Sequence, residues 1–96
     1  MKILAIEKEV PGVKVEQYSL HLKVEALKLW ELYQAGKVRE FYFSKDNFAV
    51  LILECSDEYE ASEILDSLPL VKEGLIKFDI MPLLPYPGFG RLFEKE

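Results

Sequence analysis

The sequence predicts one small α+β domain whose elements follow the order βαββαβ. Three observations lead to this fold class. Apolar runs of strand length alternate with longer segments of helical periodicity, and prolines and glycines separate the segments. A chain of 96 residues has room for one hydrophobic core. We therefore treat residues 1–96 as a single domain with an irregular tail at residues 84–96.

The first strand is predicted at Lys2 to Ile6, where KILAI is a nearly continuous apolar run. Such a run is typical of a strand that is covered on both faces. Pro11-Gly12 then breaks the chain. A long helix should follow from about Val15 to Ala35, with Gly36 in the position of a left-handed C-cap.

Two apolar stripes follow this predicted helix. The broader one should lie on the sheet, because its members recur on one face at about 100° per residue. Its members are Val15, Tyr18, Leu22, Ala26, Leu29, Trp30 and Tyr33. The narrower stripe consists of Leu20, Val24 and Leu27. A solvent-facing helix surface would not normally carry such a stripe, so another subunit could cover it.

A β-hairpin is predicted next. Lys37 to Phe43 is rich in aromatic and branched residues, Lys45-Asp46-Asn47 is a polar turn, and Phe48 to Leu53 is apolar throughout. The second helix follows this hairpin.

Ser56 or Asp57 should cap the second helix, and Asp57 followed by Glu60 has the spacing of a capping box. The apolar positions of this helix repeat at i, i+3, i+4 and i+7, and Pro69 is expected to close it. These positions are Ala61, Ile64, Leu65 and Leu68.

The last strand is predicted from Leu75 onward by alternation. Ile76, Phe78 and Ile80 fall on one side, Lys77 and Asp79 fall on the other, and prolines 82 and 85 should end the strand. The tail contains the aromatic sequence PYPGFGRLF. We expect this tail to be ordered in a hydrophobic groove of the same or a neighbouring subunit, because exposed aromatic residues are unusual at a frayed terminus.

This element order is that of a ferredoxin-like fold, with both helices on one face of a four-stranded antiparallel sheet. The other face has no cover, yet the first and third strands are apolar on both sides. We therefore expect a homodimer or higher homo-oligomer that uses this face. Lys77 and Asp79 would then lie in the dimer face, where they must pair or line a cavity.

Composition excludes several classes of function. The net charge of −5 and the absence of a Lys/Arg cluster argue against nucleic-acid binding. No apolar run is long enough for a membrane span and no export signal is present, so we expect a cytoplasmic protein without membrane contact. One histidine and one cysteine make a metal site unexpected. The absence of threonine and the abundance of Glu, Lys, Ile and Leu resemble thermophile composition.

Two stretches resemble a known family. Gly36-Lys37-Val38-Arg39 and SLPLVKEGLIKFDIMPL, from Ser67 to Leu83, are similar to the muconolactone isomerase group of dimeric α/β-barrel proteins. The YciI-like proteins are more distantly similar, and they place a histidine early in the first helix, as His21 is here. The resemblance covers Leu22 to about Pro87. It implies two sheets joined across a dimer, and an isomerase that moves a proton on an unsaturated lactone without cofactor or metal.

Such a reaction needs a base, a donor for the developing enolate oxygen and a cation for the substrate carboxylate. Glu25 or His21 could be the base, because they lie at i and i+4 on one helical face. Arg39 matches the resembled motif and could bind the carboxylate through its planar guanidinium. Tyr18 and Trp30 could wall a pocket. The structural alternatives are a solvated Glu25–His21 pair, a salt bridge of Arg39, and aromatic residues that belong to the core.

The sequence therefore leaves several functions open. The first is a muconolactone isomerase-like enzyme that acts without cofactor on an unsaturated lactone or a similar small carboxylated molecule. The second is a non-catalytic ligand-binding or assembly domain of the same fold. A cofactor-independent monooxygenase is a third.

Overall fold

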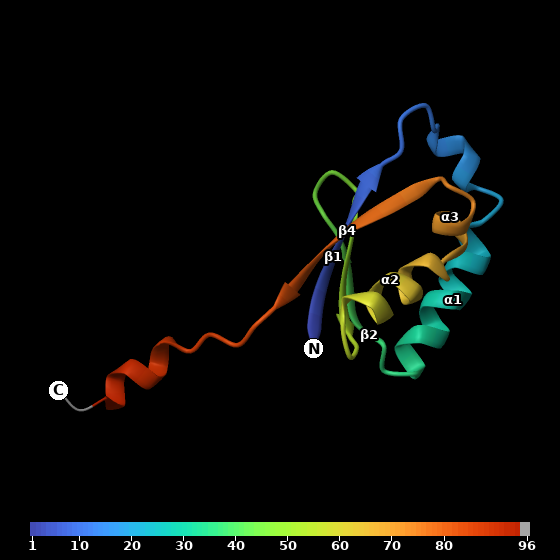
Figure 1. Cartoon of the computed structure of the whole chain (residues 1–96). Helices are drawn as coiled ribbons and strands as arrows, with labels where there is room; N and C mark the ends of the chain where they lie inside the picture. Colours follow the sequence, from blue (N-terminus) through green and yellow to red (C-terminus); the bar gives the residue numbers. More distant parts are fainter. Residues whose placement is uncertain (95–96) are drawn as a thin grey trace.

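The computed structural model describes residues 1–94 and shows a ferredoxin-like α+β fold. Its four-stranded antiparallel sheet has the order β2-β3-β1-β4, and the helices lie on one face of it (Figure 1). The predicted fold class is confirmed. In chain order, the elements are β1 (Lys2–Glu9), η1 (Val15–Tyr18), α1 (Leu22–Gln34), β2 (Val38–Phe43), β3 (Ala49–Glu54), α2 (Glu58–Asp66), α3 (Pro69–Lys72), β4 (Ile76–Leu83) and η2 (Gly88–Phe93).

The core lies between the sheet and the helices. From the sheet it receives alternate residues of β1 and β3, such as Ile3 and Leu53, because successive side chains of a strand point to opposite faces. From the helices it receives the predicted apolar face of α2 together with Leu32 of α1. The buried members of this cluster are Ile3, Ala5, Leu32, Val38, Leu51, Leu53, Cys55, Ala61, Ile64, Leu65 and Leu68.

The first helix differs from the prediction in its start and its buried face. Residues Val15–Tyr18 form a 3₁₀ turn, and the α-helix begins only at Leu22. The Ser19 hydroxyl donates a hydrogen bond to the Glu16 carbonyl, a local contact that competes with helix continuation. The buried residues of α1 are Glu25 and Leu32, so the face on the sheet is rotated from the predicted broad stripe.

Two prolines also behave differently from expectation. Helix α2 ends at Asp66, and Pro69 starts the short helix α3, where the first helical position tolerates proline. Pro82 lies inside β4, in register with Ile3, and does not end the strand. This is tolerated because β4 is an edge strand, which needs hydrogen bonds on one side only.

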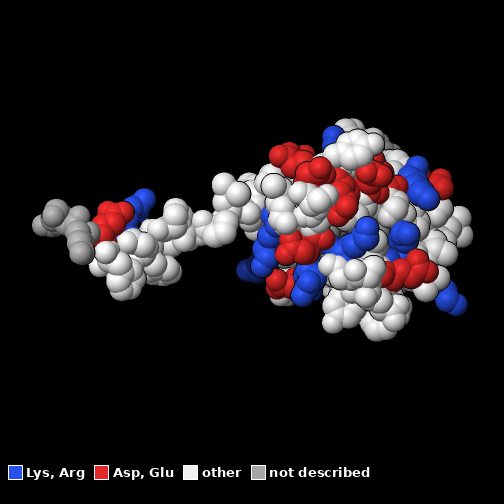
Figure 2. Space-filling model, turned by 60° about the horizontal axis from the view of Figure 1, so that its bottom comes forward, with Lys and Arg blue, Asp and Glu red and all other residues white. Residues whose placement is uncertain are grey.

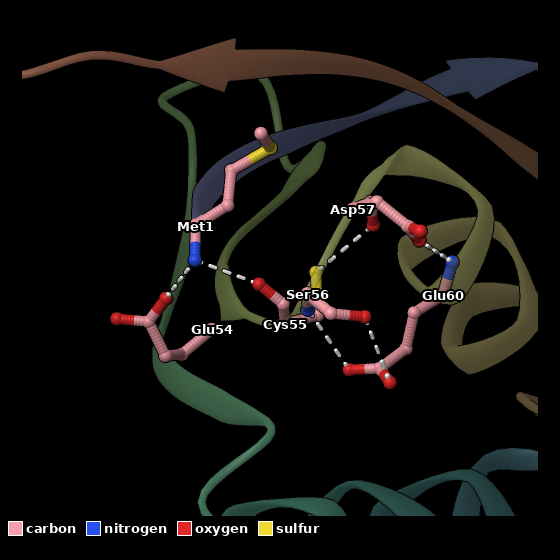
Figure 3. Close-up of polar contacts among 6 residues, drawn as sticks. All are labelled: Met1, Glu54, Cys55, Ser56, Asp57 and Glu60. Atoms are coloured by element: carbon pink, nitrogen blue, oxygen red, sulfur yellow. Dashed lines mark hydrogen bonds and ion pairs between the residues drawn. The ribbon is translucent and has the colours of Figure 1, made fainter.

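The start of β1 and the start of α2 are joined by polar contacts (Figure 3). The N-terminal ammonium group donates to the Cys55 carbonyl at 2.7 Å and pairs with the Glu54 carboxylate at 2.9 Å. Of the two predicted caps of α2, Asp57 is the one present, since its carboxylate accepts the N–H of Glu60 at 2.8 Å. The Glu60 carboxylate accepts the backbone N–H of Ser56, one residue before the position that a capping box would use.

The helix-free face of the sheet carries an apolar centre. Residues that alternate with the core positions of β1 and β3 point to this face and are half-buried; they are Leu4, Ile6, Val50 and Ile52. Lys77 and Asp79 lie on the same face, as predicted, and both are exposed. None of the helices between residues 1 and 94 combines the length and hydropathy that a membrane crossing requires.

Candidate functional site

Two carboxylates are held under the helices at one end of the sheet. Glu25 of α1 is only 8 % exposed, and its Oε1 accepts the backbone N–H of Leu70 at 2.9 Å. Glu7 of β1 lies on the helix-facing side of the sheet, and its Oε1 accepts the backbone N–H of Ala49 at 2.9 Å. Both side chains therefore have fixed positions.

The surroundings of Glu25 favour its protonated form. Burial raises the pKa of Glu25 most, and the negative charge of Glu7 raises it further. The hydrogen bond from the Leu70 N–H and the nearby His21 lower this pKa, but they only partly oppose the effect of burial. A carboxyl group of this kind can exchange a proton at a higher pH than a solvated one, which is a property of many catalytic acids and bases.

Tyr18 belongs to the same cluster of polar side chains. Its phenol is half-buried beside the small core of Leu70, Leu75 and Ile76. Burial raises the pKa of Tyr18, and the charges of Glu7 and Glu9 add to this effect. The phenol therefore keeps its proton and can donate a hydrogen bond. We call Glu7, Tyr18, His21 and Glu25 the acid cluster.

The structure thus brings together three residues that the sequence singled out, Tyr18, His21 and Glu25. The sequence reasoning missed Glu7. The sequence does contain an indication of Glu7. Alternate residues of a strand point to the same face, so Glu7 lies on the helix-facing side with the apolar Ile3 and Ala5. Between residues 1 and 94, no group of three or more His, Cys, Asp or Glu side chains is arranged to hold a metal ion.

An apolar groove of about 380 Å³ lies next to the acid cluster, between α1 and strands β2 and β3. Ala26 follows Glu25 in α1, and Ala49 is the residue whose N–H binds Glu7, so the groove and the cluster share two neighbouring elements. We call this the aromatic groove. It is lined by Ala26, Leu29, Trp30, Phe41, Tyr42, Phe43, Ala49 and Leu51.

Aromatic contacts extend from the groove over the edge of the sheet. The rings of Trp30 and Tyr33 have centroids 5.8 Å apart, and Tyr33 meets Phe41 edge-on at 5.5 Å. Trp30 is therefore an exposed wall residue of the groove, Tyr33 lies beside it, and neither belongs to the buried core. This is the arrangement that the pocket-wall interpretation of Trp30 requires.

The other predicted site residues lie elsewhere. Arg39 is exposed at the irregularity between Val38 and Glu40 in β2, and it does not line the aromatic groove. Val38 is in register with Leu53, which pairs with Ile3, so Arg39 lies about four residues, or roughly 13 Å, along the strands from Glu7. Strand β3 also separates their two strands, which adds roughly 10 Å across the sheet.

Lys77 and Asp79 lie on the helix-free face of the sheet, away from the acid cluster. Asp79 forms an exposed ion pair with Lys8 at 3.8 Å. Such a pair stabilises little at the surface. Of the two roles expected for Asp79, a paired charge or a cavity wall, its contact with Lys8 matches the paired charge.

A second hollow, of about 450 Å³, lies between α1 and α2. Its wall carries charged side chains, such as the half-buried Lys28 and the exposed Glu31, whose Nζ and Oε2 atoms are 4.0 Å apart. None of the carboxylates that line it is buried as Glu25 is. We therefore place the candidate site at the acid cluster and the aromatic groove.

Comparison with known proteins identifies the fold. No protein-family model and no curated protein sequence matches the chain. Among solved structures, 5-chloro-2-hydroxyhydroquinone dehydrochlorinase from Burkholderia phenoliruptrix AC1100, in complex with 2,5-dihydroxybenzoquinone, is similar with a TM-score of 0.69. The two chains are 18 % identical, and the match covers 88 % of this chain and 94 % of the other. At this identity the likeness shows a shared ferredoxin-like fold.

Proposed function

We propose that the chain is a small enzyme that moves a proton on an unsaturated lactone or a similar small carboxylated molecule, without a cofactor. The observation that carries this proposal is the buried Glu25, whose pKa is raised and which lies beside His21 and an apolar groove. The structural likeness to a dehydrochlorinase that holds a small cyclic quinone supports a role in small-molecule chemistry.

The proposed reaction uses Glu25 as the base. Its carboxylate takes a proton from a carbon next to the carbonyl, and the C–H electron pair moves into the conjugated system as an enolate. The Tyr18 hydroxyl donates a hydrogen bond to the enolate oxygen. The proton then returns to a different carbon, so the double bond moves and the atoms balance. The His21 imidazole would donate a hydrogen bond to the substrate carboxylate, and the aromatic groove would hold the ring.

Assembly belongs to the same proposal. We infer that two copies pack through the helix-free face of the sheet, because Leu4, Ile6 and Ile52 form an apolar centre there. Charged residues at its margin, such as Lys8 and Asp79, would set the register of the two copies.

A non-catalytic role is the second candidate, and one contact favours it. The hydrogen bond from the Leu70 N–H to Glu25 holds the start of α3 against α1. If this hydrogen bond is the only role of Glu25, the carboxylate is a structural brace, that is, a residue that only holds α3 against α1. The groove would then bind a ligand without catalysing a reaction.

Two substitutions at one position separate these candidates. Glu25→Gln keeps an oxygen that can accept the Leu70 N–H but cannot take up a proton, whereas Glu25→Ala removes both functions. Hydrogen–deuterium exchange at carbon, followed by NMR with a panel of carboxylated unsaturated lactones, measures the proton transfer directly.

We expect wild type to catalyse exchange in at least one compound, and Glu25→Gln to lose about 10²- to 10⁴-fold in rate with no loss of melting temperature. Ser62→Ala, at an exposed position of α2, is the control and should keep the wild-type rate. If Glu25→Gln exchanges as fast as wild type and only Glu25→Ala is destabilised, the brace is the correct role.

A further inference from the structure

The C-terminal arm, residues 84–94, leaves the end of β4 and extends away from the rest of the molecule (Figure 1). Most of its surface is uncharged (Figure 2). Its five large apolar side chains are Leu84, Tyr86, Phe89, Leu92 and Phe93, with exposed fractions of 82, 68, 70, 75 and 83 %. An exposed apolar segment of this size marks an interaction surface.

The arm has a shape of its own. Gly88–Phe93 forms a 3₁₀ turn, and the rings of Tyr86 and Phe89 meet edge-on with centroids 5.2 Å apart. Gly88 is buried under the Tyr86 ring, where a Cβ would lie 2.0 Å from ring atoms. Prolines 85 and 87 restrict the residues before them to extended conformations. The end of the arm is therefore a preformed apolar turn, which we call the plug, and a proline-restricted segment of limited flexibility joins it to β4.

We propose that the C-terminal arm of one copy docks in the aromatic groove of a second copy. This contact is separate from the helix-free sheet face, but it uses the groove that the proposed reaction assigns to the substrate ring, so a docked arm would exclude that ring. The groove is concave and apolar, and two of its wall residues, Trp30 and Phe43, are 55 and 75 % exposed.

The position of the groove favours a second copy over the same chain. The groove lies at the β2 edge of the sheet, whereas the arm continues from β4 at the opposite edge, roughly 14 Å across. The arm also points away from the body, along the direction that β4 sets (Figure 1). Each copy thus presents one plug and one groove that do not meet within the chain.

The area of this contact fits a stable dimer. An aromatic side chain buries at least about 150 Å² when it is fully covered. The three aromatic residues of the arm, each about 70 to 80 % exposed, can therefore lose roughly 300 Å² together. The groove would lose a similar area. Two reciprocal contacts then bury roughly 1,200 Å², the lower end of the range for specific interfaces.

Trp30 is the single tryptophan of the chain and lies in the groove, so its fluorescence reports whether the groove is covered. The reporter is the full chain with Phe89→Ser and Phe93→Ser, which disables its own arm and keeps Trp30. The donor is the full chain with Trp30→Phe, which has an intact arm and no tryptophan. Mixing them tests whether the donor arm covers the reporter groove in trans.

On mixing, we expect a blue shift of Trp30 emission and a fall of acrylamide quenching by about half or more, because a 55 % exposed ring becomes buried. A donor that also carries Phe89→Ser and Phe93→Ser should have no effect. A reporter with Phe43→Ser should lose the response. A reporter with Leu27→Ser should keep it, because Leu27 is 56 % exposed on α1 but outside the groove.

Three results would overturn the proposal. Trp30 could remain equally quenched with the intact donor, or the arm-disabled donor could act as well as the intact one. The response could also depend on Leu27 and not on Phe43, which would place the arm on the narrow stripe of α1 and not in the aromatic groove.

Discussion

Among single residues, Glu25 should make the stability of the fold depend on pH. Its pKa is raised by burial, so the folded protein binds this proton more tightly than the unfolded chain does. A raised folded pKa gives a stabilising contribution that is fully present below the unfolded pKa, near 4.5, and is lost as the pH rises through the folded pKa. Glu25 therefore makes folding less favourable at neutral pH than at mildly acidic pH.

Glu25→Gln should remove this pH dependence. Relative to wild type, the variant should gain free energy of unfolding as the pH rises from about 4.5 to neutral, since glutamine carries no charge to bury. Urea unfolding at a series of pH values measures the difference between the two curves. A constant difference across the series would show that Glu25 titrates like a solvated carboxyl group.

Cys55 should be a poor nucleophile. It is buried, and burial raises the pKa of its thiol, so little thiolate is present at neutral pH. In native protein, reaction with a thiol-specific reagent should be much slower than in urea-unfolded protein. Equal rates in the two states would contradict this description of Cys55.

Single residues of the site were predictable only where local periodicity places them. The i, i+4 spacing brought His21 and Glu25 together correctly. The contact of Glu7 with the N–H of Ala49 depends on the pairing of β1 with β3, which no local pattern specifies. The position of Trp30 at the groove wall, and not in the core, follows from the register of α1 over the edge strand β2.

Among the secondary-structure elements, α2 offers the clearest test of a local interaction. The Asp57 carboxylate accepts the N–H of Glu60 at 2.8 Å and is the cap of this helix. Asp57→Ala should lower the free energy of unfolding by about 1 kcal/mol. Ser62→Ala, within the same helix at an exposed position, should change it by less than about 0.5 kcal/mol. Chemical denaturation compares the two, and equal effects would argue against the cap.

The positions of helices and strands could be predicted wherever one strong sequence pattern determines them. Apolar runs and alternation predicted all four strands, and the i, i+3, i+4 repeat predicted the buried face of α2. The prediction failed where tertiary context decides. The burial of Glu25 rotates α1, and the edge position of β4 admits Pro82. The short helix α3 was missed because four residues carry too little periodicity.

For the whole molecule, the helix-free sheet face leads to a prediction of its own. Ile52 is half-buried near the centre of this face, so Ile52→Lys should place a charge in the proposed interface and weaken a dimer strongly. Tyr59→Lys on α2, which is more exposed, should leave assembly unchanged. Light scattering at micromolar concentration measures both. A wild-type monomer would contradict the dimer that the doubly apolar strands predict.

The proposed proton transfer requires a carboxyl group that holds a proton beside the apolar groove, and Glu25 is the residue proposed for this role. A ¹³C NMR titration of the side-chain carboxyl of Glu25, in full-length protein, tests it most directly. We predict a midpoint above 4.5, and a lower midpoint when Glu7→Gln removes the neighbouring negative charge. A Glu25 midpoint at or below 4.5, unchanged by Glu7→Gln, would contradict the claim.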